Sequence, residues 1–257
     1  MKKDTATDFM LYSFMGITSG DKEETCVFAC IMKAYTDATN QGAYNTKIKD
    51  LHEVSNDAKK EAATYLYEEC RKRFTQQNSQ SLNFDTWHEN LCEKLVNCYE
   101  KVNNSKTDSM IFTFGNAQKW VNMTLKYMDL LVSMGMLKSY KDLIEKNRSK
   151  FHIPIDSYIL YALWNDEGIT NELKEKFPCD KEKYPHNSEH NHALYKVTGW
   201  SNWSSYDIYK DFKNDVIEKL KTMEDPFDYE NEIWIEEAKR RKAKETEDRI
   251  KSFFKMK

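Results

Sequence analysis

The chain has 257 residues, 40% of them hydrophobic and 32% charged, which excludes a disordered polymer and is typical of a globular protein with a sizeable core. Its net charge of −3 excludes a surface coated in positive charge but not a local basic groove, because phosphates are recognised by local charge. Only seven Gly and four Pro are present, and long helices exclude both. We therefore expect an all-α fold, with residues 1–257 forming a single helical domain.

The N-terminal residues and the cysteines indicate the compartment. Lys2 and Lys3 are followed by Asp4 and Asp8 and by no apolar run, so no secretory signal is predicted. No stretch approaches the roughly 18 apolar residues of a membrane span. The six cysteines include no CxxC pair and are expected to be reduced thiols. We expect a cytoplasmic monomer without membrane association.

Helical periodicity predicts most of the elements in chain order. The first twenty residues are expected to be irregular, with Gly16 and Gly20 as stops. Helices are predicted from Asp21 through Met32, over 45–75, and from an N-cap at Asp85 through Cys98. A buried helix follows near 115–136, and further helices are predicted over 140–149, 154–164, 170–176, 206–223 and 231–254. The stretch 177–203 lacks clear periodicity and is a candidate functional loop.

The buried helix carries the most informative pattern. Gly115 gives the preceding turn its backbone freedom, and Asn116 is the expected N-cap. Most of the helix is apolar, but polar side chains recur at steps of +3, +4, +3 and +4 and so share one stripe: Lys119, Asn122, Lys126, Asp129 and Ser133. Because unpaired buried charge is expensive, the stripe must face a cleft, a buried network or a partner. The structural alternative is a Lys126–Asp129 pair on a half-exposed edge.

Two residues in this region have the chemistry of a catalytic site. Lys119 is expected in the first turn of the buried helix, where the helix dipole and partial burial favour the neutral amine. A neutral amine is a nucleophile able to form a Schiff base with a sugar carbon. Pro154 is expected to open a later helix with Asp156 in its first turn, where a carboxylate stays ionised. An ordinary capping role is the alternative for Asp156.

Two short motifs resemble the helix-hairpin-helix DNA glycosylases, particularly the archaeal 8-oxoguanine glycosylase branch. Gln118-Lys119, followed seven positions later by Lys126-Tyr127-Met128, is similar to the segment that bears the catalytic lysine of that superfamily. Pro154-Ile155-Asp156 is similar to the Pro-Ile/Val-Asp motif that supplies its catalytic aspartate. The resemblance covers residues 112–164, and of the superfamily's Leu-Pro-Gly-Val-Gly hairpin only Gly115 is present.

The resemblance implies a helical bundle with a cleft between two lobes, acting as a DNA N-glycosylase that also cleaves the strand as a lyase. Lys119 would attack C1′ of a flipped nucleotide, and Asp156 would stabilise the developing oxocarbenium ion. The implied partner is double-stranded DNA with a damaged or modified base, and neither a cofactor nor a metal is required. Oxidised guanine, in a repair role, is what this branch suggests. A bulky modified pyrimidine of viral DNA, in a defence role, is the alternative.

Further contacts are implied by the same resemblance. Aromatic side chains would clasp the flipped base, for which Phe151, Trp200 and Trp203 are the candidates, and Asp207 would hydrogen-bond the base edge. DNA contacts are expected from the start of the lysine helix, at Gly115, Asn116 and Gln118. Basic residues between the two motifs either touch phosphates or form the wet face of a helix: Lys138, Lys141, Lys146, Arg148 and Lys150.

Two alternatives remain open. His186, His190 and His192 lie beside Glu189 at a spacing that can hold zinc, or they belong to a solvated loop. The chain can also be a non-enzymatic helical binding protein whose polar stripe is structural. One geometric requirement separates that function from a glycosylase, because the amine of Lys119 and the carboxylate of Asp156 must meet in one cleft that is open to solvent. A wide gap between them, or two separately satisfied salt bridges, would favour the binding protein.

Overall fold

The computed structural model describes residues 5–39, 49–76, 82–104, 112–156, 158–159, 203, 205–207, 209–210, 213–214 and 225–255. These residues are mostly helical and contain no strand, so the expected all-α class is confirmed for this part of the chain. Within the same ranges, no helix combines the length and the apolar character needed to cross a membrane.

The described helices follow the predicted order, with two additions, one at the N-terminus and one directly after the helix that ends at Cys98. α1 (Thr5–Met15) occupies residues expected to be irregular and ends where Gly16 adopts a φ of 74°. Periodicity missed α1 because several of its large apolar side chains are exposed and mark no buried stripe. The elements that follow are α2 (Glu23–Thr39), α3 (Lys49–Thr75), α4 (Phe84–Cys98), α5 (Glu100–Asn103), α6 (Phe114–Ser133), α7 (Lys141–Asn147), the 3-10 turn η2 (Arg148–Lys150) and α11 (Pro226–Lys255).

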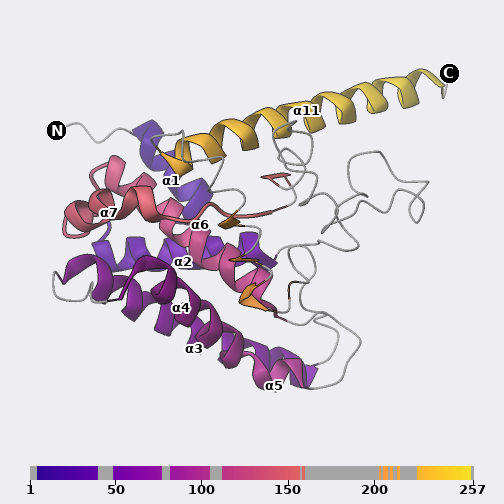
Figure 1. The fold of residues 1–257 in the computed structure, drawn as a ribbon. Helices are drawn as coiled ribbons and strands as arrows, with labels where there is room; N and C mark the ends of the chain where they lie inside the picture. Colours follow the sequence, from indigo (N-terminus) through magenta and orange to yellow (C-terminus); the bar gives the residue numbers. More distant parts are fainter. Residues whose placement is uncertain are drawn as a thin grey trace.

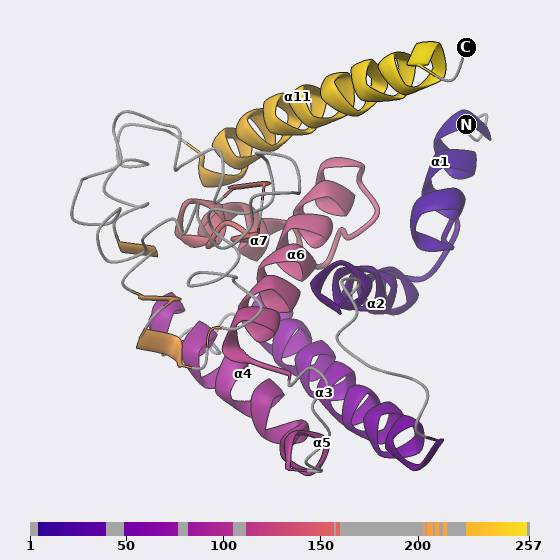
Figure 2. The same ribbon diagram turned by 90° about the vertical axis from the view of Figure 1, so that its right-hand side faces the viewer.

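α6 is the central helix of the described fold, and it packs against α2, α4 and α7 (Figures 1 and 2). Its contact with α2 is the most extensive. Four small side chains of α2 are buried at steps of four and let the two helices approach closely: Cys26, Cys30, Ala34 and Ala38. Trp120 Nε1 of α6 donates to the Ile31 carbonyl of α2 at 2.9 Å. The expected burial of this helix is therefore confirmed.

The start of α6 lies three residues before the expected one. Its N-cap is Thr113, whose hydroxyl accepts from the Asn116 amide at 3.3 Å, while the Asn116 side chain accepts from the Thr113 amide at 3.1 Å. The prediction of an N-cap at Asn116 is wrong because both members of this capping box are good caps and Thr113 comes first. Lys119 consequently lies in the second turn, beyond the part of the helix where the dipole acts strongly.

Two other predicted helix starts are also corrected. α4 is capped by Asn83, whose Oδ1 accepts from the Thr86 amide at 2.7 Å, and not by Asp85. Pro154 does not open a helix, because residues 151–156 are not helical and Asp156 caps the helical residues 158–159 instead. The helix predicted over 170–176 lies outside the described residues, as does the candidate loop up to residue 202.

Candidate active site

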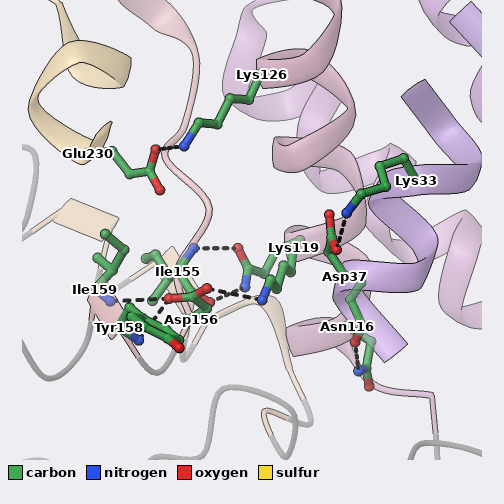
Figure 3. A network of polar contacts seen from close by, with 12 residues as sticks. Lys33, Asp37, Asn116, Lys119, Lys126, Ile155, Asp156, Tyr158, Ile159 and Glu230 are labelled. Carbon is green, nitrogen blue, oxygen red and sulfur yellow. Dashed lines mark hydrogen bonds and ion pairs between the residues drawn. The ribbon is translucent and has the colours of Figure 1, made fainter. Parts of the chain in front are cut away.

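The polar stripe of α6 faces two later parts of the chain, residues 151–156 and the start of α11 (Figure 3). Four of its residues contact these parts of the chain or η2. Three form ion pairs, Lys119 with Asp156, Lys126 with Glu230 and Asp129 with Arg148 of η2, and Asn122 donates to the Ile153 carbonyl. The alternative Lys126–Asp129 pair is wrong, since each of these residues pairs with another element. The stripe therefore forms a buried network, one of the three expected environments.

Lys119 and Asp156 meet although 37 residues separate them. Nζ of Lys119 lies 3.1 Å from Oδ2 of Asp156, and the two side chains are only 10% and 12% exposed. The other carboxylate oxygen, Oδ1, accepts from the backbone amides of Tyr158 at 2.9 Å and Ile159 at 3.1 Å. One oxygen of Asp156 thus caps a helix start while the other faces the amine, so capping and charge pairing belong to different atoms.

A second ion pair, between Lys126 and Glu230, lies close to the first (Figure 3). The Glu230 side chain is 2% exposed, and that of Lys126 is 19% exposed. Burial raises the pKa of the Glu230 carboxyl, Lys126 counteracts this shift, and the Asp156 carboxylate adds to it. Two lysines and two carboxylates therefore form one electroneutral cluster where α6, residues 151–156 and α11 meet.

Side-chain amides of α6 hold the chain that leads to Asp156. Gln118 Nε2 donates to the Ile155 carbonyl at 3.0 Å, and the Ile155 amide faces Gln118 Oε1 at 3.5 Å. Asn122 Nδ2 donates to the Ile153 carbonyl at 3.1 Å and also lies 3.1 Å from Gln118 Oε1. These contacts satisfy buried backbone groups that no strand or helix pairs within residues 151–156.

A hydrogen-bonded chain continues from Asn122 to the surface. Asn122 Nδ2 lies 3.2 Å from the Tyr209 hydroxyl, which lies 2.9 Å from His152 Nδ1, and His152 Nε2 lies 2.7 Å from Asp85 Oδ1. Burial lowers the pKa of His152 to about 4, so near pH 7 the ring is neutral and its proton sits on Nε2, facing the carboxylate. The Tyr209 hydroxyl accordingly donates to Nδ1, and it shares the two hydrogens of Asn122 Nδ2 with the Ile153 carbonyl and Gln118 Oε1.

His88 of α4 completes this network on the other side of Asn122. Its Nε2 lies 2.8 Å from Asn122 Oδ1, and its Nδ1 lies 3.1 Å from the Tyr206 hydroxyl. Burial lowers the pKa of His88 well below its usual range, so this ring is neutral as well. Because an amide oxygen only accepts, Nε2 carries the proton and Tyr206 donates to Nδ1. The Asn122 amide is thereby oriented, with Oδ1 toward His88 and Nδ2 toward residues 151–156.

No protein-family model, curated protein or solved structure matches this chain. The function must therefore be inferred from the chemistry of the cluster itself. Lys119 and Asp156 form an ion pair, so the lysine is a nucleophile only after its ammonium has given up a proton, and the carboxylate can stabilise a positive charge that develops beside it.

The aromatic residue expected next to the site is part of the core. Phe151 is 3% exposed, and its ring packs against those of Phe74, Phe84 and Phe227 at centroid distances of 5.4 to 5.8 Å. A ring enclosed by three others stabilises the fold and is poorly placed to stack on a base. Phe151 is therefore not among the base-contacting residues that we propose.

The other residues expected to hold the base have different positions. Trp203 is buried, and its carbonyl accepts from the Gly115 amide at 3.3 Å. Asp207 is exposed, whereas Trp200 lies outside the described residues. Of the three expected base-binding side chains that the structure describes, only that of Asp207 is exposed.

The residues expected to contact DNA are used inside the protein. Gly115, Asn116 and Gln118 are all buried, and the Asn116 side chain donates to the Ala38 carbonyl at 2.9 Å. Arg148, in the basic run before the aspartate motif, contacts three carboxylates: Asp129 at 3.0 Å, Asp228 at 3.3 Å and Asp225. The histidines at 186, 190 and 192 lie outside the described residues, and no group of potential metal ligands occurs within those that are described.

Several residues of the network were not expected from the sequence. Glu230, His88, His152 and Tyr209 all contact the stripe or its neighbours from other elements. Asn122 was the one available signal, because a primary amide on a helix that is otherwise apolar requires several buried hydrogen-bond partners.

Proposed function

We propose that the protein is a DNA N-glycosylase with lyase activity, and that Lys119 is its nucleophile and Asp156 its charge-stabilising carboxylate. The observation that supports this proposal is the 3.1 Å contact between Lys119 Nζ and Asp156 Oδ2. The two motifs that resemble the helix-hairpin-helix glycosylases meet at this contact, although 37 residues lie between them. A helical fold is consistent with membership of that superfamily.

The chemistry proceeds from these two side chains. The Lys119 ammonium gives a proton to the departing base, and the neutral amine that results forms a bond to C1′ of the flipped nucleotide. The C1′–N glycosidic bond breaks, its electron pair leaves with the base, and the base takes up a proton. Asp156 would stabilise the positive charge that develops on the sugar as that bond breaks. The C1′–O4′ bond then breaks, O4′ takes up the second proton from Nζ, and an imine joins Nζ to C1′. Transfer of a C2′ proton to water forms the C2′–C3′ double bond, and the C3′–O electron pair leaves with the 3′ phosphate.

Oxidised guanine in duplex DNA is the substrate that the resemblance favours, and a bulky modified pyrimidine of viral DNA is the alternative. A panel of duplexes that each carry one modified base distinguishes them by which base is released. Binding of the duplex requires positive groups outside the buried cluster, since the cluster is electroneutral.

An abasic duplex tests the proposal without knowledge of the base. An abasic site presents the C1′ aldehyde directly, so borohydride should trap a covalent adduct between the protein and the DNA. Lys119→Gln should abolish trapping. Lys126→Gln is the matched control, because Lys126 lies seven residues further along the same helix and is also ion-paired. It should trap at close to the wild-type rate.

Two results would overturn the assignment. Equal trapping by wild type and Lys119→Gln would show that another amine reacts, and loss of trapping only in Lys126→Gln would move the nucleophile to that residue. If no duplex in the panel loses a base and the abasic duplex is not trapped by the wild type, the glycosylase proposal fails.

The second candidate function is a non-enzymatic helical binding protein. The observation that favours it is the capping of residues 158–159 by Asp156 Oδ1, which gives this carboxylate a structural role independent of catalysis. In that case Lys119→Gln would change stability and leave any partner binding intact, and no imine would form with any DNA.

A further inference from the structure

Residues 151–156 present a packing problem that α6 solves. The segment is buried, yet it lies in neither a helix nor a sheet, and Pro154 has no amide hydrogen. Its carbonyls at Ile153 and Ile155 point to α6, where the side-chain amides of Asn122 and Gln118 donate to them. Side-chain amides thus take the place of a neighbouring strand.

The spacing of these contacts is set by geometry. Gln118 and Asn122 are four residues apart, a rise of about 6 Å along a helix. Ile153 and Ile155 are two residues apart, about 6.6 Å along an extended chain. The two distances nearly match, so two amides one helical turn apart can donate to two carbonyls that are two residues apart. The segment runs antiparallel to α6, because Gln118 contacts Ile155 and Asn122 contacts Ile153. Lys119, which follows Gln118, and Asp156, which follows Ile155, are in contact at the same end of this match.

We propose that Gln118 and Asn122 are positioning residues, which hold residues 151–156 in the one register that brings the Asp156 carboxylate to Lys119. The catalytic consequence of this register rests on the proposed glycosylase function, whereas the register itself does not depend on that function. A shift of one residue in an extended segment turns every side chain to the opposite face, so the carboxylate would leave the amine.

The orientation of Asn122 reinforces this register. Its Oδ1 accepts from His88 Nε2, so its Nδ2 must face the Ile153 carbonyl, and Gln118 Oε1 accepts from the same Nδ2. Gln118 in turn directs its own Nε2 toward the Ile155 carbonyl. Each amide therefore has its donor side determined by the other contacts in the network.

The test compares how fast two lysines are methylated in the protein without DNA. Formaldehyde and cyanoborohydride methylate lysines at rates that depend on accessibility and ion pairing. Peptide mass spectrometry measures the extent of methylation at Lys119 and at Lys126 in the same sample. Gln118→Met removes both amide functions without adding charge. It should raise the modification rate of Lys119 on the order of tenfold relative to Lys126, the effect expected when a buried hydrogen bond that anchors the segment is lost.

Thr124→Val is the matched control. It removes a buried hydrogen bond of α6, from the Thr124 hydroxyl to the Trp120 carbonyl at 2.8 Å, that makes no contact with residues 151–156. It should lower stability without changing the ratio of Lys119 to Lys126 modification. In abasic-site trapping, Gln118→Met should lower the single-turnover rate and leave the Kd for DNA unchanged.

The outcomes separate the two proposals. If Gln118→Met loses stability but leaves the Lys119 ratio unchanged, the positioning role is overturned. If the ratio changes while wild type traps no abasic DNA, the register stands and the glycosylase fails. Should Gln118→Met fail to fold, both lysines would be modified rapidly. Gln118→Asn, whose shorter amide cannot span both Ile155 groups, then gives the same comparison and the same criterion.

Discussion

Replacement of Asp156 by Asn separates the two roles that its oxygens hold. The amide oxygen can still accept from the Tyr158 and Ile159 amides, so the helix cap is retained. With the amide oxygen at the cap, the NH2 group faces Lys119, and it cannot accept from the ammonium that lies 3.1 Å from the charged oxygen in the wild type. The variant therefore removes charge pairing while keeping shape.

The expected loss of stability follows from the burial of this pair. Removing one partner of a buried ion pair costs about 3–5 kcal/mol, and because both side chains keep about a tenth of their exposure we expect about 2–3 kcal/mol. A domain with roughly 5 kcal/mol of stability would still be about 97% folded after that loss. Unfolding can therefore explain only a few per cent of any loss of activity, whereas losing the carboxylate charge should lower the rate about 100- to 1,000-fold.

Urea unfolding followed by circular dichroism gives the change in stability, and single-turnover trapping of abasic DNA gives the change in rate. Glu230→Gln is the control, because it leaves Lys126 without its buried partner near the same site. It should cost a similar free energy and leave trapping nearly intact. A rate for Asp156→Asn that falls only in proportion to its unfolded fraction would refute the reasoning and leave Asp156 as a structural cap.

Burial lowers the pKa of His152 from 6.5 to about 4, so its contribution to stability is present above pH 6.5 and lost as the pH falls through 4. The loss should be about 3 kcal/mol in urea unfolding, and His152→Gln should remove that part of the pH dependence. Arg148→Ala leaves the buried carboxylate of Asp129 without this guanidinium and should lower the free energy of unfolding by about 1–3 kcal/mol. It should also speed proteolysis of α11, because the contact with Asp228 of that helix is lost. Affinity for duplex DNA should fall steeply with salt despite the net charge of −3, and a flat salt dependence would exclude binding through phosphates.

Local patterns in the sequence predicted the elements well. The scarcity of Gly and Pro indicated a helical fold, and the apolar circumference of residues 115–136 indicated the burial of α6. Helix starts were less accurate wherever two good caps lie close together, as at Thr113 and Asn116. A capping box satisfies both, and periodicity cannot decide which of them begins the helix.

The partners of the stripe could not be predicted in the same way. Steps of three and four residues show that Lys119 and Lys126 share a face, but their partners lie 37 and 104 residues away. The role of an aromatic ring such as Phe151 likewise depends on what packs around it. Asp156 was the exception, because its short motif pointed to a meeting with Lys119 before any contact was seen.

The two ion pairs of the cluster contribute differently to the fold. Lys126–Glu230 joins α6 to α11, whereas residues 151–156 are already held to α6 by the amides of Gln118 and Asn122. We therefore expect that the Lys119–Asp156 charges are not needed for attachment, because a buried ion pair is often no more stabilising than apolar side chains of similar volume.

The double variant Lys119→Met/Asp156→Asn should therefore be more stable than Asp156→Asn alone and close to wild type in urea unfolding, because it removes the buried ammonium together with the carboxylate that it faces. It should form no imine with abasic DNA. Lys126→Met/Glu230→Gln should instead loosen α11, seen as faster proteolysis of that helix, while trapping continues. If the first double variant is as unstable as the sum of its single changes, the charges are part of the attachment and a structural role accounts for them. If it is stable and inactive, a chemical role explains why the chain keeps a lysine and an aspartate there.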